Sequence, residues 1–523
     1  MTTTSATSTS NFTLRIWLPL ILFGALAALT ISPRAAVAEP VIDDSPTRVQ
    51  TTLSTGLTPV GTLVPKSVNE ISTSRWTIGC EVLDREYANY DSYKEYLAPL
   101  GIRRIRLQGG WARTEKEKGI YDFAWLDHII DDARSRGLEI WFETSYGNPI
   151  YPGGGGRSLA GGIPTSEEGL AAWDKWVTLT AQRYKDKVHD WCVWNEPNFG
   201  LNPPETFFAF TVRTAEIIKR EIPDAQVAAL ALMQSDYDHV GPFLEYLKQR
   251  DKLDLISAIV YHHYTENPDT AYPPVEKMRQ VIRSYSPNIR LWQGESGTMS
   301  QWGPVGALNH YPWTELTQAK WDTRRMLGDF GHDADSGVFS IADYEYRTTP
   351  WLNGVAPYGL IKTDKAAKGF KVLKVKIAYY AVQNVVSVFN DNLRLIDGAD
   401  PEVQCEKPVY ARACRFVDSS RPLIFFWDMS SAPANTNDTT PATITAKGMT
   451  FNDPVWVDLI TGDAYAIPAD RIETTGGDTP TTIFRDIPVY DAPAFITDRA
   501  NLDLRQSEYV KFLAAEAAKN AKK

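Results

Sequence analysis

Cysteine, histidine and clustered basic residues are all scarce in this chain. It has 4 cysteines and 7 histidines in 523 residues, and no Cys-x-x-Cys pair. The adjacent pair His262-His263 is the closest approach to metal-ligand spacing, so we expect no metal site. The net charge is -10, and the chain has no basic run outside its lysine-rich end. Because phosphate binding needs clustered Lys and Arg, nucleic acid is not an expected partner.

The four cysteines fit export without requiring it. Cys405 and Cys414 lie nine residues apart and flank a turn-like segment, so a disulfide could link them across a hairpin. Cys80 and Cys192 are far apart in the sequence and fall on expected strands. Buried free thiols are therefore the default expectation for this second pair.

Long hydrophobic runs are also rare, and the one that stands out is near the start of the chain. Residues 16–31 are apolar, Arg15 precedes them, and Ala36-Val37-Ala38 follows with the small-x-small pattern that signal peptidase cleaves. We expect residues 1–38 to be a cleaved signal peptide, with the mature, secreted or periplasmic protein starting near Glu39. An uncleaved membrane anchor is the alternative, although a spanning helix needs about 20 apolar residues.

A regular alternation begins at residue 75. Short β-rich runs are separated by amphipathic stretches such as Ala124–Arg136, in which apolar residues recur at spacings of three and four. Because parallel strands need a crossover between them, eight such alternations predict an α/β fold with a (β/α)₈ TIM barrel over residues 75–390. The expected strands are Trp76–Cys80, Arg103–Leu107, Leu138–Glu143, Trp191–Glu196, Val227–Leu232, Ser257–His262, Ile289–Glu295 and Gly337–Ala342.

Different patterns flank the expected barrel. Residues 39–74, rich in Thr, Ser, Pro and Val, are expected to form an irregular lead-in, and Lys368–Phe389 is expected to be one long helix. Apolar residues then alternate with a period of two, which predicts a C-terminal antiparallel β-sandwich over residues 391–500 and a helical tail over 501–523. The candidate strands of the sandwich are Val409–Phe416, Leu423–Met429, Ala442–Lys447, Val455–Leu459 and Ala494–Thr497.

Three of the eight barrel strands end in a glutamate, namely Glu143, Glu196 and Glu295. Catalytic groups of barrel enzymes project from these carboxyl-terminal strand ends. A carboxylate that breaks an apolar run also needs a reason, because burying an unpaired charge costs several kcal/mol. Cleavage of a glycosidic bond requires two carboxyl groups that flank the bond. A pair of these strand-end glutamates could meet that requirement.

The sequence Trp194-Asn195-Glu196-Pro197-Asn198 resembles the acid/base motif of glycoside hydrolase clan A, in which asparagine precedes the catalytic glutamate. The resemblance implies that Glu196 is the acid/base and that Asn195 binds the sugar 2-hydroxyl. Neighbouring residues of a regular strand point to opposite faces, so both can serve one site only if the strand end is bulged or turns away. A structural Asn-Glu-Pro turn is the alternative.

Glu295 ends the seventh strand, where clan A enzymes carry the nucleophile. The resemblance implies retention of anomeric configuration, with carboxyl groups about 5–5.5 Å apart and no metal or organic cofactor. Glu295 would attack the anomeric carbon, and Glu196 would act first as acid and then as base. A solvated loop glutamate is the alternative interpretation of Glu295.

Further strand ends match the same clan. Arg106 corresponds to the second-strand arginine that keeps the nucleophile ionised, with Arg104 as its rival in the same face register. His262 and Tyr264 match a sixth-strand His-x-Tyr pattern whose tyrosine hydrogen-bonds the nucleophile, while His263 is expected in the core or on the surface.

Aromatic residues are abundant, with 16 Trp, 24 Tyr and 20 Phe, and sugar rings stack on such side chains. Core filling is the alternative role for most of them. The candidate sugar-binding residues are the strand-end Glu143 and the possible stacking platforms Trp111, Tyr146, Trp292 and Trp302.

Within the clan, the chain is most similar to the β-xylosidase/α-L-iduronidase family (family 39). Residues 121–149, including Phe142-Glu143, resemble the segment from the second helix to the third strand of that family. Residues 378–382 resemble its final barrel helix, and residues 488–493 resemble part of its sandwich.

Three departures from family 39 lie around the expected sugar pocket. Gln108-Gly109 stands where the family has His-Gly, and Gln293-Gly294-Glu295-Ser296 replaces a motif closer to Thr-Glu-Trp. The segment 340–344 lacks the tryptophan common at the eighth strand end. These differences leave both the family and the sugar open.

Taken together, the motifs predict an exported retaining glycosidase that acts on an oligo- or polysaccharide of plant, algal or glycosaminoglycan type. A non-catalytic carbohydrate-binding barrel and a transglycosylase with the same residues are the alternatives. A serine hydrolase is disfavoured, since Gly294-Glu295-Ser296-Gly297 is followed by Thr298 where a nucleophile elbow needs glycine. The glycine-rich loop 152–162 lacks the Gly-Lys-Ser/Thr ending of a nucleotide-binding loop.

Overall fold

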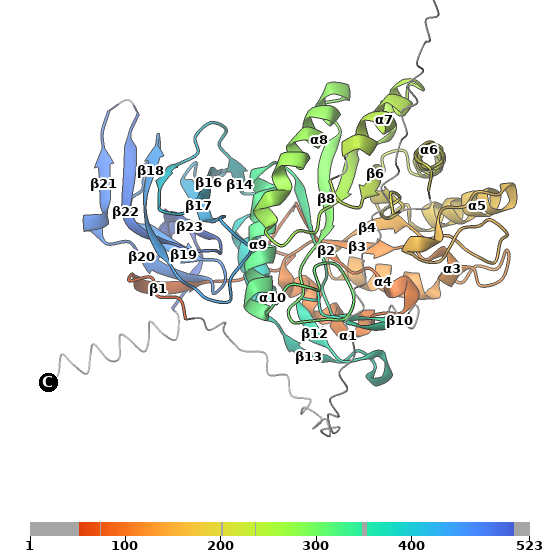
Figure 1. Ribbon diagram of the computed structural model, residues 1–523, viewed down its shortest axis with the longest axis horizontal. Helices are drawn as coiled ribbons and strands as arrows, with labels where there is room; N and C mark the ends of the chain where they lie inside the picture. Colours follow the sequence, from red (N-terminus) through yellow and green to blue (C-terminus); the bar gives the residue numbers. More distant parts are fainter. Residues whose placement is uncertain are drawn as a thin grey trace, which may run out of the picture. The chain divides into compact units, whose positions relative to one another are not determined.

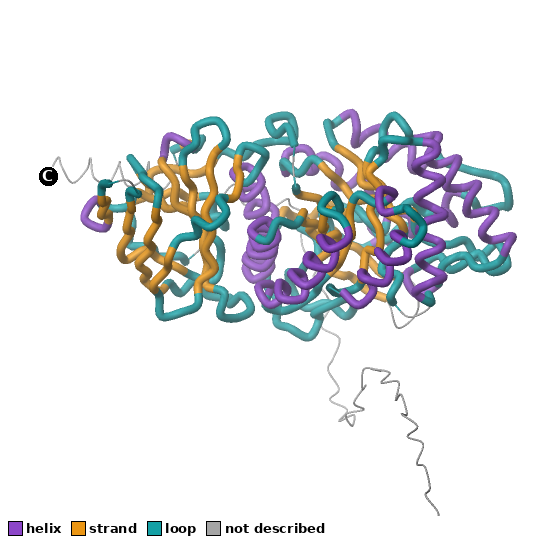
Figure 2. The backbone as a smooth tube through the Cα atoms, turned by 90° about the horizontal axis from the view of Figure 1, so that it is seen from above, coloured by secondary structure: helices purple, strands orange, loops and turns teal. Residues whose placement is uncertain are grey.

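The computed structural model describes residues 52–73, 75–199, 202–235, 237–347, 353–477 and 479–506, all within one compact unit, residues 42–523 (Figures 1 and 2). The expected signal peptide at 1–38 and the expected helical tail beyond residue 506 lie outside the described residues. Within those ranges, no helix has the length and apolar character needed to cross a membrane.

Eight parallel strands close into a barrel, each hydrogen-bonded to the next in chain order, and the last pairs with the first through Thr77 and Gly337. The predicted TIM barrel and all eight predicted strands are therefore confirmed, with ends shifted by a few residues. The strands are β2 (Trp76–Gly79), β3 (Arg104–Gln108), β4 (Glu139–Thr144), β5 (Asp190–Val193), β6 (Gln226–Leu232), β7 (Ala258–His262), β8 (Arg290–Ser296) and β9 (Asp335–Val338).

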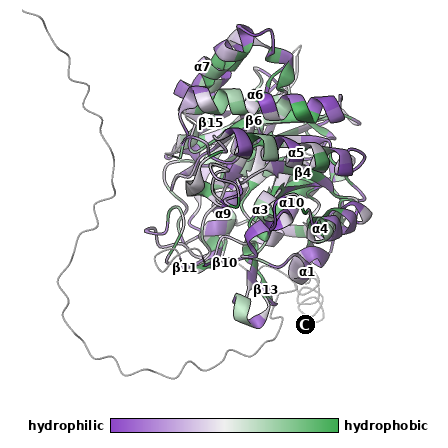
Figure 3. Cartoon of the chain, turned by 90° about the vertical axis from the view of Figure 1, so that its right-hand side faces the viewer, coloured by the Kyte–Doolittle hydropathy of each residue, from purple (hydrophilic) through white to green (hydrophobic). Residues whose placement is uncertain are grey.

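Amphipathic helices surround the barrel. In α4 the side chains of Leu126, Ile129 and Ile130 are buried, as the spacing of apolar residues predicts. Ser166 caps α5 by accepting a hydrogen bond from the backbone N–H of Gly169 at 2.9 Å. Hydrophobic and hydrophilic residues alternate along helices such as α6 (Figure 3). The helices are α1 (Tyr90–Tyr93), α2 (Leu97–Leu100), α3 (Trp111–Thr114), α4 (Ala124–Ser135), α5 (Glu167–Tyr184), α6 (Pro204–Glu221), α7 (Tyr237–Lys248), α8 (Tyr272–Tyr285), α9 (Glu315–Gly331) and α10 (Ile377–Val388).

The predicted long helix Lys368–Phe389 is wrong in its first half. A hairpin of β12 (Ile361–Thr363) and β13 (Val372–Val375) comes first, and only then does α10 begin. Gly369 has a φ of 85°, which ends the preceding helical turn, and the alternation of Lys and apolar residues at 371–376 suits a strand. A second hairpin, β10 (Tyr344–Arg347) and β11 (Asn353–Ala356), also follows the last barrel strand.

The C-terminal strands form two antiparallel sheets, ordered β14-β16-β17-β23-β19-β20-β1-β24 and β15-β18-β22-β21. All five predicted strands are present, but Cys405 and Cys414 are free thiols and do not form the disulfide considered for them. The strands after α10 are β14 (Leu393–Leu395), β15 (Glu402–Gln404), β16 (Val409–Phe416), β17 (Pro422–Asp428), β18 (Thr440–Lys447), β19 (Pro454–Asp458), β20 (Asp463–Ala466), β21 (Ile472–Thr475), β22 (Thr481–Val489), β23 (Ala494–Asp498) and β24 (Leu504–Arg505).

The expectation of an irregular lead-in is corrected by β1 (Thr58–Leu63), which pairs with β20 and β24 of the C-terminal sheet. The strand β24 likewise replaces helix at the start of the predicted tail. Gly61 permits the close approach of these strands, because a Cβ there would meet the carbonyl oxygen of Arg505 at 3.0 Å. Both strands depend on partners distant in sequence, which a local pattern does not reveal.

Helix α9 joins the barrel to the C-terminal sheets. The Lys320 ammonium is fully buried and donates to Asp491 Oδ1 at 2.5 Å and to the carbonyl oxygen of Ala434 at 3.0 Å. Trp427 of β17 donates from its indole N–H to Asp269 Oδ1 at 2.9 Å. The barrel and the C-terminal sheets are therefore held together by buried polar contacts as well as by apolar packing.

Candidate active site

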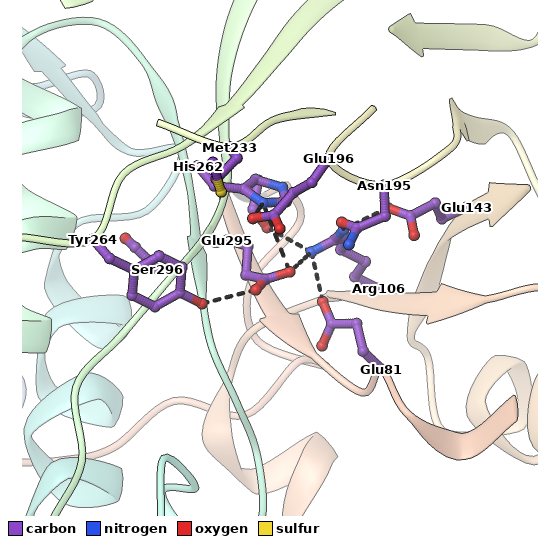
Figure 4. A network of polar contacts seen from close by, with 12 residues as sticks. Glu81, Arg106, Glu143, Asn195, Glu196, Met233, His262, Tyr264, Glu295 and Ser296 are labelled. Carbon is purple, nitrogen blue, oxygen red and sulfur yellow. Dashed lines mark hydrogen bonds and ion pairs between the residues drawn. The ribbon is translucent and has the colours of Figure 1, made fainter. Parts of the chain in front are cut away.

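The carboxyl-terminal ends of the barrel strands bring most of the predicted site residues together. Figure 4 shows these side chains pointing toward one another from different strands. The group comprises Arg106 on β3, Glu143 on β4, Asn195 and Glu196 after β5, His262 on β7, Tyr264 after β7 and Glu295 on β8.

Glu295 is held at both carboxylate oxygens. Arg106 Nη1 donates to Oε2 at 2.6 Å, and the Tyr264 hydroxyl donates to Oε1 at 2.8 Å (Figure 4). Burial alone would raise the pKa of Glu295. The charges of His262 and Arg106 and the hydrogen bonds from Tyr264 and Arg106 outweigh burial, so its pKa lies below the ordinary glutamate value. The site therefore favours an ionised Glu295.

Glu196 faces the same space because strand β5 stops before it. Trp194 and Glu196 have left-handed φ angles of 65° and 45°, so the backbone turns and both Asn195 and Glu196 reach the site. The backbone N–H of Glu196 donates to the carbonyl oxygen of Ala231 at 2.9 Å. The turn expected from the two adjacent motif residues is thus present at the end of β5.

Glu196 and Glu295 lie close together beside one histidine. His262 Nδ1 is 2.9 Å from Glu196 Oε1 and 3.9 Å from Glu295 Oε2. One oxygen of each carboxyl group and a ring nitrogen of His262 lie within 4.8 Å of one another, a grouping that could also hold a metal ion.

Arg106 is the centre of the charged network. Its fully buried guanidinium contacts Glu81, Glu143 and Glu295, and it donates to Asn195 Oδ1 at 2.6 Å. Arg104 instead contacts Asp190, Asp335 and Thr77 at the other end of the barrel interior. Of the two arginines that the sequence left open, only Arg106 lies in the site.

Glu143, Gln108 and Tyr146 form one wall of the site. Gln108 Nε2 donates to Glu143 Oε1 at 3.2 Å and to the Tyr146 hydroxyl at 3.3 Å. Asn195 Nδ2 donates to the same hydroxyl at 2.9 Å. Gln108, which departs from the family pattern, therefore orients two predicted site residues. Arg85 closes this wall, with its guanidinium 5.0 Å from the centre of the Tyr146 ring.

Glu81 is the functional candidate that the sequence prediction missed. It lies two residues beyond β2, is 4% exposed, and its Oε1 is 2.9 Å from Arg106 Nη1. The expected first strand was ended at Cys80, one residue short of this glutamate. The criterion that selected Glu143, a carboxylate directly after an apolar strand, would have found it.

Two predicted sugar platforms are corrected by their burial. Trp111 is 0% exposed and packs among Tyr151, Trp173 and Trp176. Trp292 is 1% exposed inside the barrel, with its ring 5.2 Å from that of Trp141. These large rings fill the core, which was the alternative considered for each.

The remaining aromatic and polar candidates differ in exposure and in their contacts. Tyr146 is 2% exposed, so it contributes its hydroxyl group and not an open ring face. Trp302, in the loop after β8, is 70% exposed and remains available for stacking. His263 contacts Ser235, and burial together with the charge of Arg325 lowers its pKa to about 3. The Ser296 hydroxyl contacts the amide of Gln293, an arrangement unlike an activated serine.

Sequence comparisons connect the chain to glycosidases over limited stretches. A family model described as beta-galactosidase (glycoside hydrolase family 42) matches residues 92–152. A 6-phospho-beta-glucosidase of Clostridium longisporum is 26% identical over 211 residues, which is 36% of this chain and 40% of the relative. The match thus spans less than half of that relative.

Solved structures extend the similarity to most of the chain. A family 39 glycoside hydrolase from Bacteroides cellulosilyticus WH2 has a TM-score of 0.54 and 15% identity, covering 81% of this chain and 80% of that one. A family 39 enzyme from Xanthomonas axonopodis pv. citri has a TM-score of 0.51 and 15% identity, covering 89% and 99%. A monomeric beta-xylosidase from Caulobacter crescentus CB15 has a TM-score of 0.50 and 15% identity, covering 84% and 97%. The chain therefore shares the two-domain fold of these family 39 glycoside hydrolases, a parallel barrel followed by antiparallel sheets, as the resemblance in sequence predicts.

Proposed function

We propose that the protein is a retaining glycoside hydrolase that cleaves O-glycosidic bonds of an oligo- or polysaccharide. The observation that carries this proposal is the placement of Glu196 and Glu295, whose nearest carboxyl oxygens lie within 4.8 Å of each other. Retaining glycosidases hold their two carboxyl groups about 5–5.5 Å apart, whereas inverting enzymes leave room for a water molecule between them. The short separation favours double displacement.

In the first step, Glu196 protonates the glycosidic oxygen while Glu295 attacks the anomeric carbon. Arg106 and Tyr264 hold the two oxygens of Glu295, which keeps it ionised and fixes its direction of attack. The bond to the leaving group breaks as the bond from Glu295 to the sugar forms. The product is a covalent glycosyl-enzyme.

In the second step, Glu196 accepts a proton from water as the water oxygen attacks the anomeric carbon from the face opposite Glu295. The bond between the sugar and Glu295 breaks at the same time, which releases the sugar and returns Glu295 to its ionised form. The contact of 2.9 Å between His262 Nδ1 and Glu196 Oε1 supports this change of role by orienting the carboxyl group. Asn195, fixed by Arg106 and Tyr146, presents its amide toward the sugar 2-hydroxyl.

The test compares hydrolysis of aryl glycosides and polysaccharides by the wild type, Glu196→Ala and Glu295→Ala. We expect loss of the acid/base to lower kcat by about 10²–10⁴-fold on substrates with poor leaving groups. Loss of the nucleophile should lower it by at least about 10⁴-fold. Glu139→Ala, at the opposite end of β4 and half-exposed, is the matched control and should retain activity.

Azide separates the two roles. Added azide should rescue Glu295→Ala to a glycosyl azide of inverted configuration and Glu196→Ala to one of retained configuration. Full activity in either variant would show that the assignment is wrong. Sugar binding without turnover by the wild type would instead favour the carbohydrate-binding barrel, and transfer to an added sugar would favour the transglycosylase.

The names of the similar proteins guide the choice of substrates for this test. Xylosides, galactosides and 6-phosphoglucosides belong in the panel because structural and sequence relatives carry these names.

We further propose that the protein is exported and that its signal peptide is cleaved after Ala38. Amino-terminal sequencing of the protein from the periplasm or medium should give a sequence that starts near Glu39. An intact amino terminus in the membrane fraction would indicate an anchor instead.

A further inference from the structure

The site contains more negative charge around Arg106 than one guanidinium can neutralise. Glu81, Glu143 and Glu295 all contact this single arginine, and all three side chains are at least mostly buried. Three ionised carboxylates would exceed the charge of Arg106 by two, and the His262 ring, 3.9 Å from Glu295 Oε2, can offset at most one of these charges. Because like charges at close range disfavour joint ionisation, at least one of these groups is expected to be neutral.

Hydrogen bonds distinguish Glu143 from Glu81. Glu143 accepts from three side-chain donors: Arg106, the Ser145 hydroxyl at 2.8 Å and Gln108 Nε2 at 3.2 Å. Glu81 has one such donor, Arg106, at its Oε1, while its Oε2 is buried and has no partner. An ionised carboxylate with a bare, buried oxygen is costly, so Glu81 is the group that stays uncharged.

The backbone is shaped to admit this side chain. A Cβ at Gly79 would collide with Oε2 of Glu81, so glycine at the end of β2 leaves the space into which the carboxyl group folds. The titratable and charged groups that face it are Arg106, Glu143 and Glu295 from other strands, together with Tyr93 of α1 and the neighbouring Cys80. Arg106 is the one cation among them.

We propose that Glu81 is a positioning residue whose uncharged carboxyl group orients Arg106 toward the nucleophile Glu295 without competing for its charge. The role of Glu295 as nucleophile belongs to the proposed function above, on which this inference rests. Glu81 does not touch the sugar and acts through Arg106. One guanidinium edge is thereby fixed by an acceptor that withdraws little of its charge from Glu295.

The electrostatics of the site agree with this geometry. Burial, only partly opposed by Arg106 and by the backbone N–H of Glu81 itself, and reinforced by the charges of Glu295 and Glu143, raises the pKa of Glu81 to about 8. Above that pH, an ionised Glu81 would draw Arg106 away from Glu295. The positioning therefore works at neutral pH and weakens in alkaline solution.

Infrared difference spectroscopy tests the charge state without any need for activity. The wild type minus Glu81→Gln at pH 7 should show the C=O band of a protonated carboxylic acid. That band should disappear as the pH is raised through about 8. A difference spectrum with only carboxylate bands at pH 7 would overturn the inference, whether or not the protein hydrolyses glycosides.

Kinetics test the positioning role. Glu81→Ala should lower kcat/KM by at least about 10-fold and move the acid limb of its pH profile upward, because Arg106 no longer lies firmly on Glu295. Glu81→Gln, which keeps an uncharged acceptor, should recover most of that loss. Its kcat/KM relative to wild type should rise by at least about 3-fold between pH 7 and pH 9.

Glu143 supplies the matched contrast. Glu143→Gln places an amide N–H opposite groups that already donate to Glu143. It should therefore lower kcat/KM as much as Glu143→Ala does. Equal damage by Glu81→Gln and Glu81→Ala would mean that Glu81 acts as an anion, and the inference would fail. A wild type inactive on every glycoside would refute the proposed function alone, since the infrared result still decides the state of Glu81.

Discussion

Individual hydroxyl groups tune the carboxylates of this site, and Tyr264 is the clearest case. Its hydroxyl donates to Glu295 Oε1 at 2.8 Å and is one cause of the low pKa of that carboxyl group. Tyr264→Phe removes the donor and leaves the ring. We expect kcat to fall by about 10-fold or more, since a charge-assisted hydrogen bond contributes about 1.5–3 kcal/mol.

The same substitution should change the pH profile in a definite direction. Without the Tyr264 hydroxyl the pKa of Glu295 rises, so the acid limb of kcat/KM moves to higher pH. Tyr184→Phe is the control, because its hydroxyl donates to Asp127 at 2.9 Å in the helical shell. A shift of equal size in both variants would assign the effect to general destabilisation.

Glu81 also predicts how stability depends on pH. Its pKa is about 8 in the folded protein and near the ordinary value of 4.5 when unfolded, so the folded state binds the proton more tightly. The stability that this proton contributes is complete below pH 4.5 and is lost as the pH rises toward 8. In denaturant unfolding, Glu81→Gln should gain stability relative to wild type over that interval. Parallel stability curves would contradict the raised pKa.

Sequence patterns located the residues that lie at strand ends and not those that depend on packing. Glu196, Glu295 and Arg106 stand at positions that a barrel directs toward one opening, so strand counting brought them together. Exposure of Trp111 depends on the helices packed around it, which no local motif specifies. Glu81 could have been located by the same strand-end criterion, but its role depends on its distance from Arg106.

Among the elements, the barrel strands were predictable because short, largely buried runs alternate regularly with amphipathic helices. Short strands at sheet edges were not, as β1 and β24 show. Their sequences have no strong alternation, and they become strands through pairing with residues distant in the chain. Strand β13 falls within the segment predicted as helix, because its lysines and apolar residues fit both periods over so short a stretch.

Removal of β1 should therefore damage a domain that lies far away in sequence. A shortened chain that begins at residue 65 leaves β20 and β24 without their shared neighbour, exposing backbone groups that promote association. Compared with a chain that begins at residue 52, we expect its melting temperature to fall by about 5 °C or more. Identical melting and solubility would show that β1 contributes nothing to the sheet.

At the scale of the molecule, the buried Lys320 links α9 to loops of the C-terminal sheets. Its side chain is 0% exposed, and that of its partner Asp491 is 13% exposed. Lys320→Met removes the cation that donates to Asp491 Oδ1 and to the carbonyl oxygens of Ala434 and Thr436, so the unfolding free energy should fall by about 3–5 kcal/mol. Lys374→Met is the control, since its pair with Glu315 is partly exposed and worth about 1 kcal/mol or less. Equal losses in guanidinium unfolding would refute this role of Lys320.

The pairing of β1 with β24 shows that the barrel and the sandwich do not simply follow one another along the chain. These strands come from the two ends of the described chain, yet they are adjacent in one sheet. The whole barrel is thus an insertion between the first and second strands of a discontinuous sandwich. During synthesis that sheet stays incomplete until its last strand has left the ribosome. A circular permutant that joins residue 505 to residue 58 by a short linker, and opens elsewhere, should keep the same sheet order.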